Sequence, residues 1–174
     1  MTTSEATALD TQESKQLTTP SDLDRRGVVE IAGELKQLLA DVFVLYIKTK
    51  NFHWHMSGPH FRDYHLLLDE HAEQIFSITD DIAERARKIG ETTIHSVGEI
   101  LHFARLKEDT SGFVTPRNML TELHQDNLHL LRSLRQTHEL CAKHDDVATT
   151  SLIEVWIDQA ERRAWFLFET VRAM

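Results

Sequence analysis

Apolar residues recur every three or four positions along most of this chain, and this spacing is the feature that most constrains its fold. The first such stripe contains Ile31, Leu35, Leu38, Leu39, Val42, Leu45 and Tyr46. This spacing is typical of one face of a helix, whereas a strand would place apolar residues at alternate positions. The chain has only six glycines and three prolines in 174 residues, and long helices tolerate few of either. The sequence therefore predicts an all-α protein.

Breaks in the pattern separate the first two helices. The first helix can be capped by Ser21 or Asp22 and is expected to run to about His55. Residues 57–59 interrupt it, because their glycine suits a left-handed helix end and their proline cannot continue a helix. The second helix is expected over residues 59–89, followed by a glycine stop.

A long connection precedes the last two helices. Residues 91–114 form this crossover, with a short helix expected at 99–102. Residues 115–116 combine a capping threonine with a proline, which predicts a third helix that continues to about residue 143. The turn at 144–146 offers an aspartate cap to a fourth helix. Two tight turns and one long crossover are the connectivity of a ferritin-like four-helix bundle.

The first 24 residues differ in composition from the rest of the chain. They contain five acids against one lysine and few large apolar side chains, so burial cannot offset the cost of ordering them. We therefore expect a flexible acidic tail over residues 1–24 and a single bundle domain over residues 25–174.

Charge and composition restrict the classes of function. The formal net charge of -9 disfavours broad binding to phosphate backbones and suits a protein that attracts cations. No apolar stretch approaches the roughly 20 residues that span a bilayer, and the start lacks the pattern of a secretory signal. The lone cysteine, Cys141, fits a reducing compartment and is expected in the core. These features predict a cytoplasmic protein.

Two pairs of side chains at i, i+4 spacing are candidate metal ligands. His65 and Asp69 form one pair, and Asp80 and Glu84 form the other. Imidazole nitrogen and carboxylate oxygen suit iron, manganese or zinc. The pairs share one helical stripe but lie roughly 16 Å apart along a straight helix, so one ion with bonds of about 2 Å cannot take both. Either each chain carries two half-sites, or an antiparallel two-fold partner supplies the complement, and His53 can join the first pair.

Other polar groups are assigned to solvent. A second acid pair, Glu122 and Asp126, is expected on a solvated face. Trp54, taken by itself, can be a core aromatic. The histidines expected on solvated faces are His55, His60, His71, His124, His129 and His138.

These residues also resemble a known family signature. The segment Lys-Asn-Phe-His-Trp-His-Met-Ser-Gly-Pro-His-Phe at residues 50–61, followed by His65, Asp69 and the Asp-Asp-Ile-Ala-Glu-Arg segment at 80–85, is similar to that of the Dps proteins, the mini-ferritins of bacteria and archaea. The resemblance implies that iron ligands come from one subunit and from its two-fold partner. His53, His65 and Asp69 would be the first set, with Asp80 and Glu84 as the second. It also places Trp54 beside the ferroxidase site.

The resemblance implies a function as well. Such a protein would be a ferroxidase that assembles as a hollow dodecamer, oxidises Fe(II) preferentially with hydrogen peroxide, stores ferric iron, and protects the cell and its DNA from oxidative damage. The alternative is a nucleoid-associated DNA-binding protein with a weak or structural metal site, which the acidic tail disfavours. Zinc or manganese in the same site stays open, because ligand type alone does not select among these metals.

Overall fold

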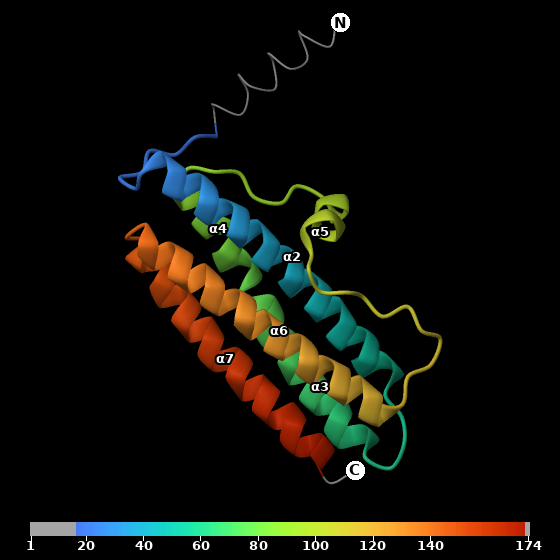
Figure 1. Ribbon diagram of the computed structural model, residues 1–174. Helices are drawn as coiled ribbons and strands as arrows, with labels where there is room; N and C mark the ends of the chain where they lie inside the picture. Colours follow the sequence, from blue (N-terminus) through green and yellow to red (C-terminus); the bar gives the residue numbers. More distant parts are fainter. Residues whose placement is uncertain (1–16, 173–174) are drawn as a thin grey trace, which may run out of the picture.

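Long helical stretches run side by side, with a shorter helix beside one of them (Figure 1). The computed structural model describes residues 17–172. Most of the predicted tail, residues 1–16, lies outside the described range. The helices are α2 (Arg25–His55), α3 (Phe61–Ser77), α4 (Thr79–Lys88), α5 (Val97–Phe103), α6 (Pro116–Lys143) and α7 (Val147–Arg172). Residues 17–172 contain no strand, which confirms the all-α prediction and the crossover between the second and third long helices.

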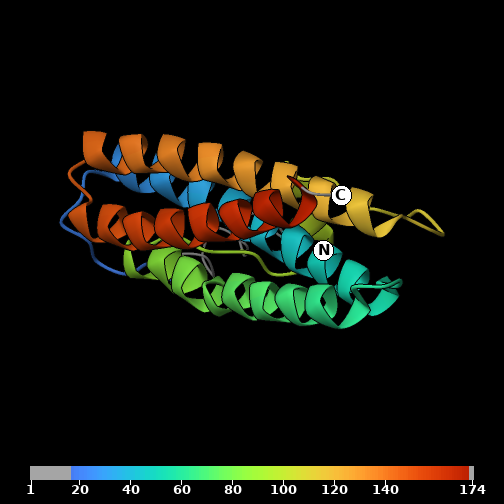
Figure 2. The ribbon, with the colours of Figure 1, turned by 90° about the horizontal axis from the view of Figure 1, so that it is seen from below.

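The helices pair as the short turns require. Helix α2 packs against α3, α4, α5 and α6, and α7 packs against α6. In Figure 2, α6 and α7 lie along one another, while α3 and α4 follow one another along the opposite edge. Every long helix contributes to one core, in which the most deeply buried side chains include Leu35, Leu68, Leu123 and Ile153. Cys141 is buried in that core as predicted.

The second long helix is not continuous, contrary to the prediction for residues 59–89. It is divided at Ile78, whose backbone has φ −90° and ψ −4°. The Ser77 hydroxyl donates to the Gln74 carbonyl (2.8 Å), and the Thr79 hydroxyl donates to the Phe76 carbonyl (2.7 Å). Hydroxyls that bond nearby carbonyls compete with regular helical hydrogen bonds, which accounts for a break at this point.

The helix caps agree with the sequence except at the start of α2. The Ser21 hydroxyl accepts a hydrogen bond from the Leu23 amide in a local turn, and Asp24 instead caps the helix by accepting from the Gly27 amide (2.9 Å). The Ser21 and Asp22 caps were therefore wrong by a few residues. The Thr115 cap of α6 is confirmed, and Asp146 accepts from the Thr149 amide ahead of α7 (3.0 Å).

Two buried or half-buried polar side chains hold parts of the bundle together through contacts that the sequence patterns did not predict. The fully buried Asp41 of α2 accepts from the backbone amides of Arg105 and Leu106, and from the Arg105 side chain, which holds the crossover against α2. His144 lies between Asp24 and Glu30, 3.1 and 3.0 Å away, and ties the start of α2 to the α6–α7 turn. Within residues 17–172, no helix has the length and apolarity required to cross a bilayer.

Candidate metal centre

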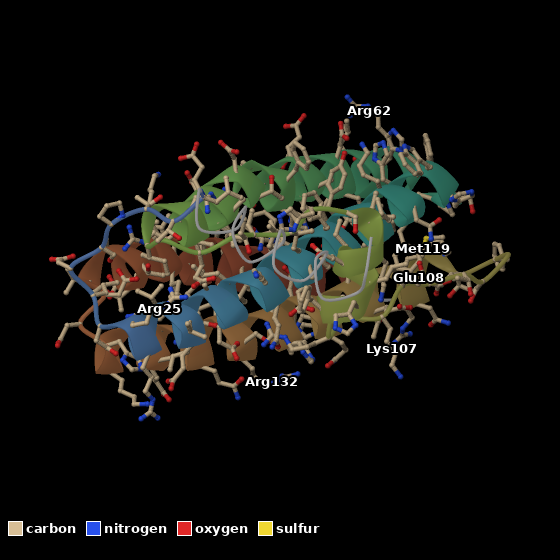
Figure 3. The ribbon with its side chains drawn as sticks, turned by 90° about the horizontal axis from the view of Figure 1, so that it is seen from above. Arg25, Arg62, Lys107, Glu108, Met119 and Arg132 are labelled. Carbon is tan, nitrogen blue, oxygen red and sulfur yellow. The ribbon has the colours of Figure 1, made fainter. Side chains whose placement is uncertain are left out.

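Two histidines interlock where α2 ends and α3 begins. The turn between the helices contains Gly58 with φ 100°, a conformation that glycine adopts readily. It brings the last turn of α2 beside α3, at the end of the bundle where Arg62 points away from the helices (Figure 3). There the rings of His53 and His65 stack with centroids 3.7 Å apart. His53 Nδ1 lies 2.8 Å from the His65 carbonyl, and His65 Nδ1 lies 2.9 Å from the His53 carbonyl.

This reciprocal pairing fixes which ring nitrogens can bind a metal. A carbonyl oxygen only accepts hydrogen bonds, so each Nδ1 must carry the hydrogen. In a neutral imidazole the free lone pair is then on Nε2. Metal-binding histidines commonly donate their other N–H to a carbonyl or carboxylate in this way. His53 and His65 therefore present two oriented Nε2 lone pairs.

Asp69 completes the group of predicted ligands from one chain. Its Oδ1 lies 3.8 Å from His53 Nε2, less than two metal–ligand bonds of about 2.1 Å laid end to end. One ion can therefore contact both atoms. The hydrogen bond from Lys50, 2.7 Å from the same Oδ1, holds the pKa of Asp69 below its usual value. Like any aspartate, this carboxylate is ionised at neutral pH, and it can bind a cation.

The other predicted ligands lie elsewhere on the chain. Asp80 and Glu84 are exposed on α4, and the Glu84 carboxylate pairs with Lys88 at 2.8 Å. No three His, Cys, Asp or Glu side chains of residues 17–172 are arranged to hold a metal ion. One chain thus supplies two separate ligand groups, and their union across a two-fold axis stays a prediction.

The surroundings of the histidines include residues that sequence reasoning missed. Trp54 is 61% exposed, so the alternative that it is a core aromatic is wrong for the single chain. The Lys50 ammonium lies 6.0 Å from the Trp54 ring centroid, and the Phe61 ring lies 5.0 Å from that of His65. The i, i+4 spacing of Lys50 and Trp54 was a usable signal for their contact.

Several solvated positions were assigned incorrectly. His71 is buried, and its burial, together with the nearby Arg163 and Arg162, lowers its pKa to about 3. His124, His129 and His138 are half-buried, whereas His55 and His60 are exposed as predicted. His71 falls on the inner side of α3 because it lies three residues after the buried Leu68 and four before the buried Ile75, a placement that its polarity concealed.

The acid pair of α6 is also not simply solvated. Lys48, with only 3% of its side chain exposed, lies 2.8 Å from both Glu122 and Asp126. Burial opposes the charge on Lys48, but its interactions with the two carboxylates outweigh burial and raise its pKa. The prediction was wrong because a buried lysine on α2 uses both acids as its partners.

Comparisons with known proteins agree on one family. The ferritin-like domain family matches residues 32–174. An uncharacterised low temperature-induced protein of Nostoc sp. is 35% identical over 148 residues, which cover 84% of this chain and 81% of the relative. The DNA protection during starvation protein of Helicobacter pylori is 28% identical over 133 residues, covering 76% and 92%.

Solved structures give the same result. DpsC from Streptomyces coelicolor superposes with a TM-score of 0.84 at 25% identity and covers 87% of this chain and 89% of its own. Dps from Vibrio cholerae, a member of a broad superfamily of ferritin-like diiron-carboxylate proteins, superposes with a TM-score of 0.83 at 27% identity, covering 88% and 96%.

Proposed function

This chain belongs to the Dps family of ferritin-like proteins, and on that premise we propose that it is a ferroxidase that stores iron. It oxidises Fe(II), preferentially with hydrogen peroxide, and keeps the ferric product inside a protein shell. The observation that carries this proposal is the interlocked pair His53 and His65, whose Nε2 atoms are free to bind a metal beside the ionised Asp69. The diiron-carboxylate superfamily of a structural neighbour and the DNA-protection names of relatives support iron chemistry that limits oxidative damage.

In this proposal the complete site lies between two subunits. His53, His65 and Asp69 of one subunit face Asp80 and Glu84 of its two-fold partner. A two-fold interface makes each contact twice, so a dimer has two sites, and six such dimers make the hollow dodecamer of the family. The separation of the two ligand groups along α3 and α4, roughly 16 Å for a straight helix, supports an antiparallel arrangement.

Each residue has a distinct role toward the substrate iron. The two neutral imidazoles bind Fe(II) without adding charge, and the carboxylates stabilise the greater charge of Fe(III). Two Fe(II) ions supply the two electrons that, with two protons, reduce one hydrogen peroxide to two waters. Trp54 lies exposed beside the ligands and can donate electrons to, or quench, a stray radical. Iron fits this role better than zinc, which has no redox chemistry.

The test is peroxide-driven iron oxidation by the full-length shell. The double variant His65→Ala with Asp69→Ala is expected to slow formation of ferric absorbance by about ten-fold or more, because removing even supporting groups at metal sites has effects of this size. A matched control, His60→Ala with Glu70→Ala, removes an exposed histidine and an exposed acid nearby and should oxidise iron at the parent rate. If the first variant keeps the parent rate in an intact shell, the site assignment is wrong.

A further inference from the structure

Lys50 occupies the position next to the oxygen that a bound metal would use. Its Nζ lies 2.7 Å from Asp69 Oδ1, and the same Oδ1 is the atom that faces His53 Nε2 at 3.8 Å. The Lys50 side chain is 18% exposed and that of Asp69 is 42% exposed, so water screens this contact only somewhat less than it would a fully exposed pair. Lys50 is therefore a component of the site and not a surface lysine that happens to lie near it.

A metal ion and this ammonium cannot both use Oδ1 without repulsion. A metal bonded to Oδ1 at about 2 Å would lie within about 5 Å of Nζ. Lys50 is one helical turn before His53 on α2, so the backbone keeps its side chain at the site. Lys50 can leave Asp69 only by turning its ammonium aside, and the electron-rich face of Trp54, 6.0 Å away, is a suitable place for a cation.

We propose that Lys50 is a built-in counter-cation that an incoming divalent metal must displace from Asp69. It holds the carboxylate in place before metal arrives, and it weakens metal binding by competing for the same oxygen. Lys50 thereby sets the concentration of Fe(II) at which this half of the site fills. This inference rests on the proposed function and adds a determinant of metal affinity to it.

Titration of the assembled, full-length protein with Co(II), which does not turn over with peroxide as iron does, measures this competition directly. Lys50→Gln is expected to bind Co(II) about two- to five-fold more tightly, the range that a partly exposed ion pair contributes. Lys50→Arg keeps the cation and should stay near the parent affinity. Lys143→Gln removes an ammonium from its pair with Glu30. Glu30 lies roughly 34 Å before His53 along α2, so this variant controls for the change in net charge.

The outcomes separate this inference from the proposed function. A gain of affinity confined to Lys50→Gln supports it, since a damaged fold would weaken binding. If the parent binds Co(II) and oxidises iron but Lys50→Gln binds equally or more weakly, the inference is overturned and the ferroxidase proposal stands. If the parent neither binds Co(II) nor oxidises iron, the proposed function fails and this inference fails with it.

Discussion

Burial determines which individual side chains of this protein can react or titrate near neutral pH. The Cys141 thiol is fully buried on α6, and the loss of solvation raises its pKa to about 12. The His71 imidazole is also buried, and its pKa of about 3 keeps it neutral. By contrast, Asp69 is ionised at neutral pH as an ordinary aspartate is, and its hydrogen bond from Lys50 lowers its pKa further. Of these three groups, only Asp69 is available to a cation from solution.

The thiol of Cys141 is therefore expected to be nearly inert in the folded protein. Because the raised pKa keeps the thiol protonated, at pH 8 iodoacetamide should modify Cys141 at least about a thousand-fold more slowly than an ordinary thiol with a pKa near 8.5. Mass spectrometry of the labelled protein gives the rate, and the same protein unfolded in denaturant is the control. Labelling of the native shell within ten-fold of the unfolded rate would contradict the assigned burial.

The residue types of the candidate site could be predicted from sequence, but their interactions could not. The i, i+4 spacing of His65 and Asp69 fixes their common face whatever the rest of the fold does. The pairing of His53 with the His65 carbonyl depends on the geometry of the α2–α3 turn, which sequence periodicity does not describe. The role of Lys50 could not be predicted because a lysine is ordinarily a solvated charge. Only the packing of α2 on α3 brings its ammonium into contact with the Asp69 carboxylate.

At the scale of helices, one buried cation joins α6 to α7. Arg163 of α7 is 1% exposed, and its Nε donates to Asn127 Oδ1 of α6 at 3.0 Å. Its two terminal nitrogens have no hydrogen-bond acceptor among residues 17–172. Burial lowers the pKa of Arg163 to about 10, so the guanidinium stays charged at neutral pH. A buried charge with one hydrogen bond is a cost to the stability of the helix pair.

The cost can be measured by removing one partner and then both. Asn127→Leu alone strips Arg163 of its acceptor and should lower the free energy of unfolding by roughly 3 kcal/mol. Asn127→Leu with Arg163→Met replaces the pair by apolar side chains and should restore the parent stability or exceed it. Denaturant unfolding at one fixed protein concentration makes the comparison, because assembly also contributes to stability. If the double variant is no more stable than Asn127→Leu, the buried Arg163 charge is compensated by other groups and does not lower the stability of the helix pair.

The order of the long helical stretches followed from the sequence, whereas the division of the second one into two helices did not. Apolar stripes and strong breakers such as Gly58 and Pro116 act over many residues, and they marked the ends of the long helices well. The division at Ile78 arises from two hydroxyl–carbonyl hydrogen bonds, a local competition that leaves the apolar stripe unchanged. The α2 cap moved to Asp24 for a similar reason, since Ser21 was already engaged in its own turn.

For the whole molecule, net charge and symmetry bear on function. A charge of -9 per chain attracts Fe(II) and repels phosphate backbones, which favours the ferroxidase over the DNA-binding alternative. Symmetry matters because neither ligand group of a single chain offers a full set of metal ligands. If the groups meet across a two-fold axis, each subunit contributes a different half to each of two sites.

Mixed shells test this division of the site between subunits. One variant, His65→Ala with Asp69→Ala, lacks the first half, and the other, Asp80→Ala with Glu84→Ala, lacks the second. A mixed dimer then has one site with both halves removed and one site with both halves intact. Random pairing of equal amounts makes half of the dimers mixed, so about a quarter of all sites should be intact. Co-assembled shells should therefore recover about a quarter of the parent rate of iron oxidation.

Shells assembled separately and then combined are the control and should stay inactive. If co-assembly restores nothing although mixed dimers form, the two ligand groups do not combine across the dimer, and the antiparallel two-fold site would be excluded.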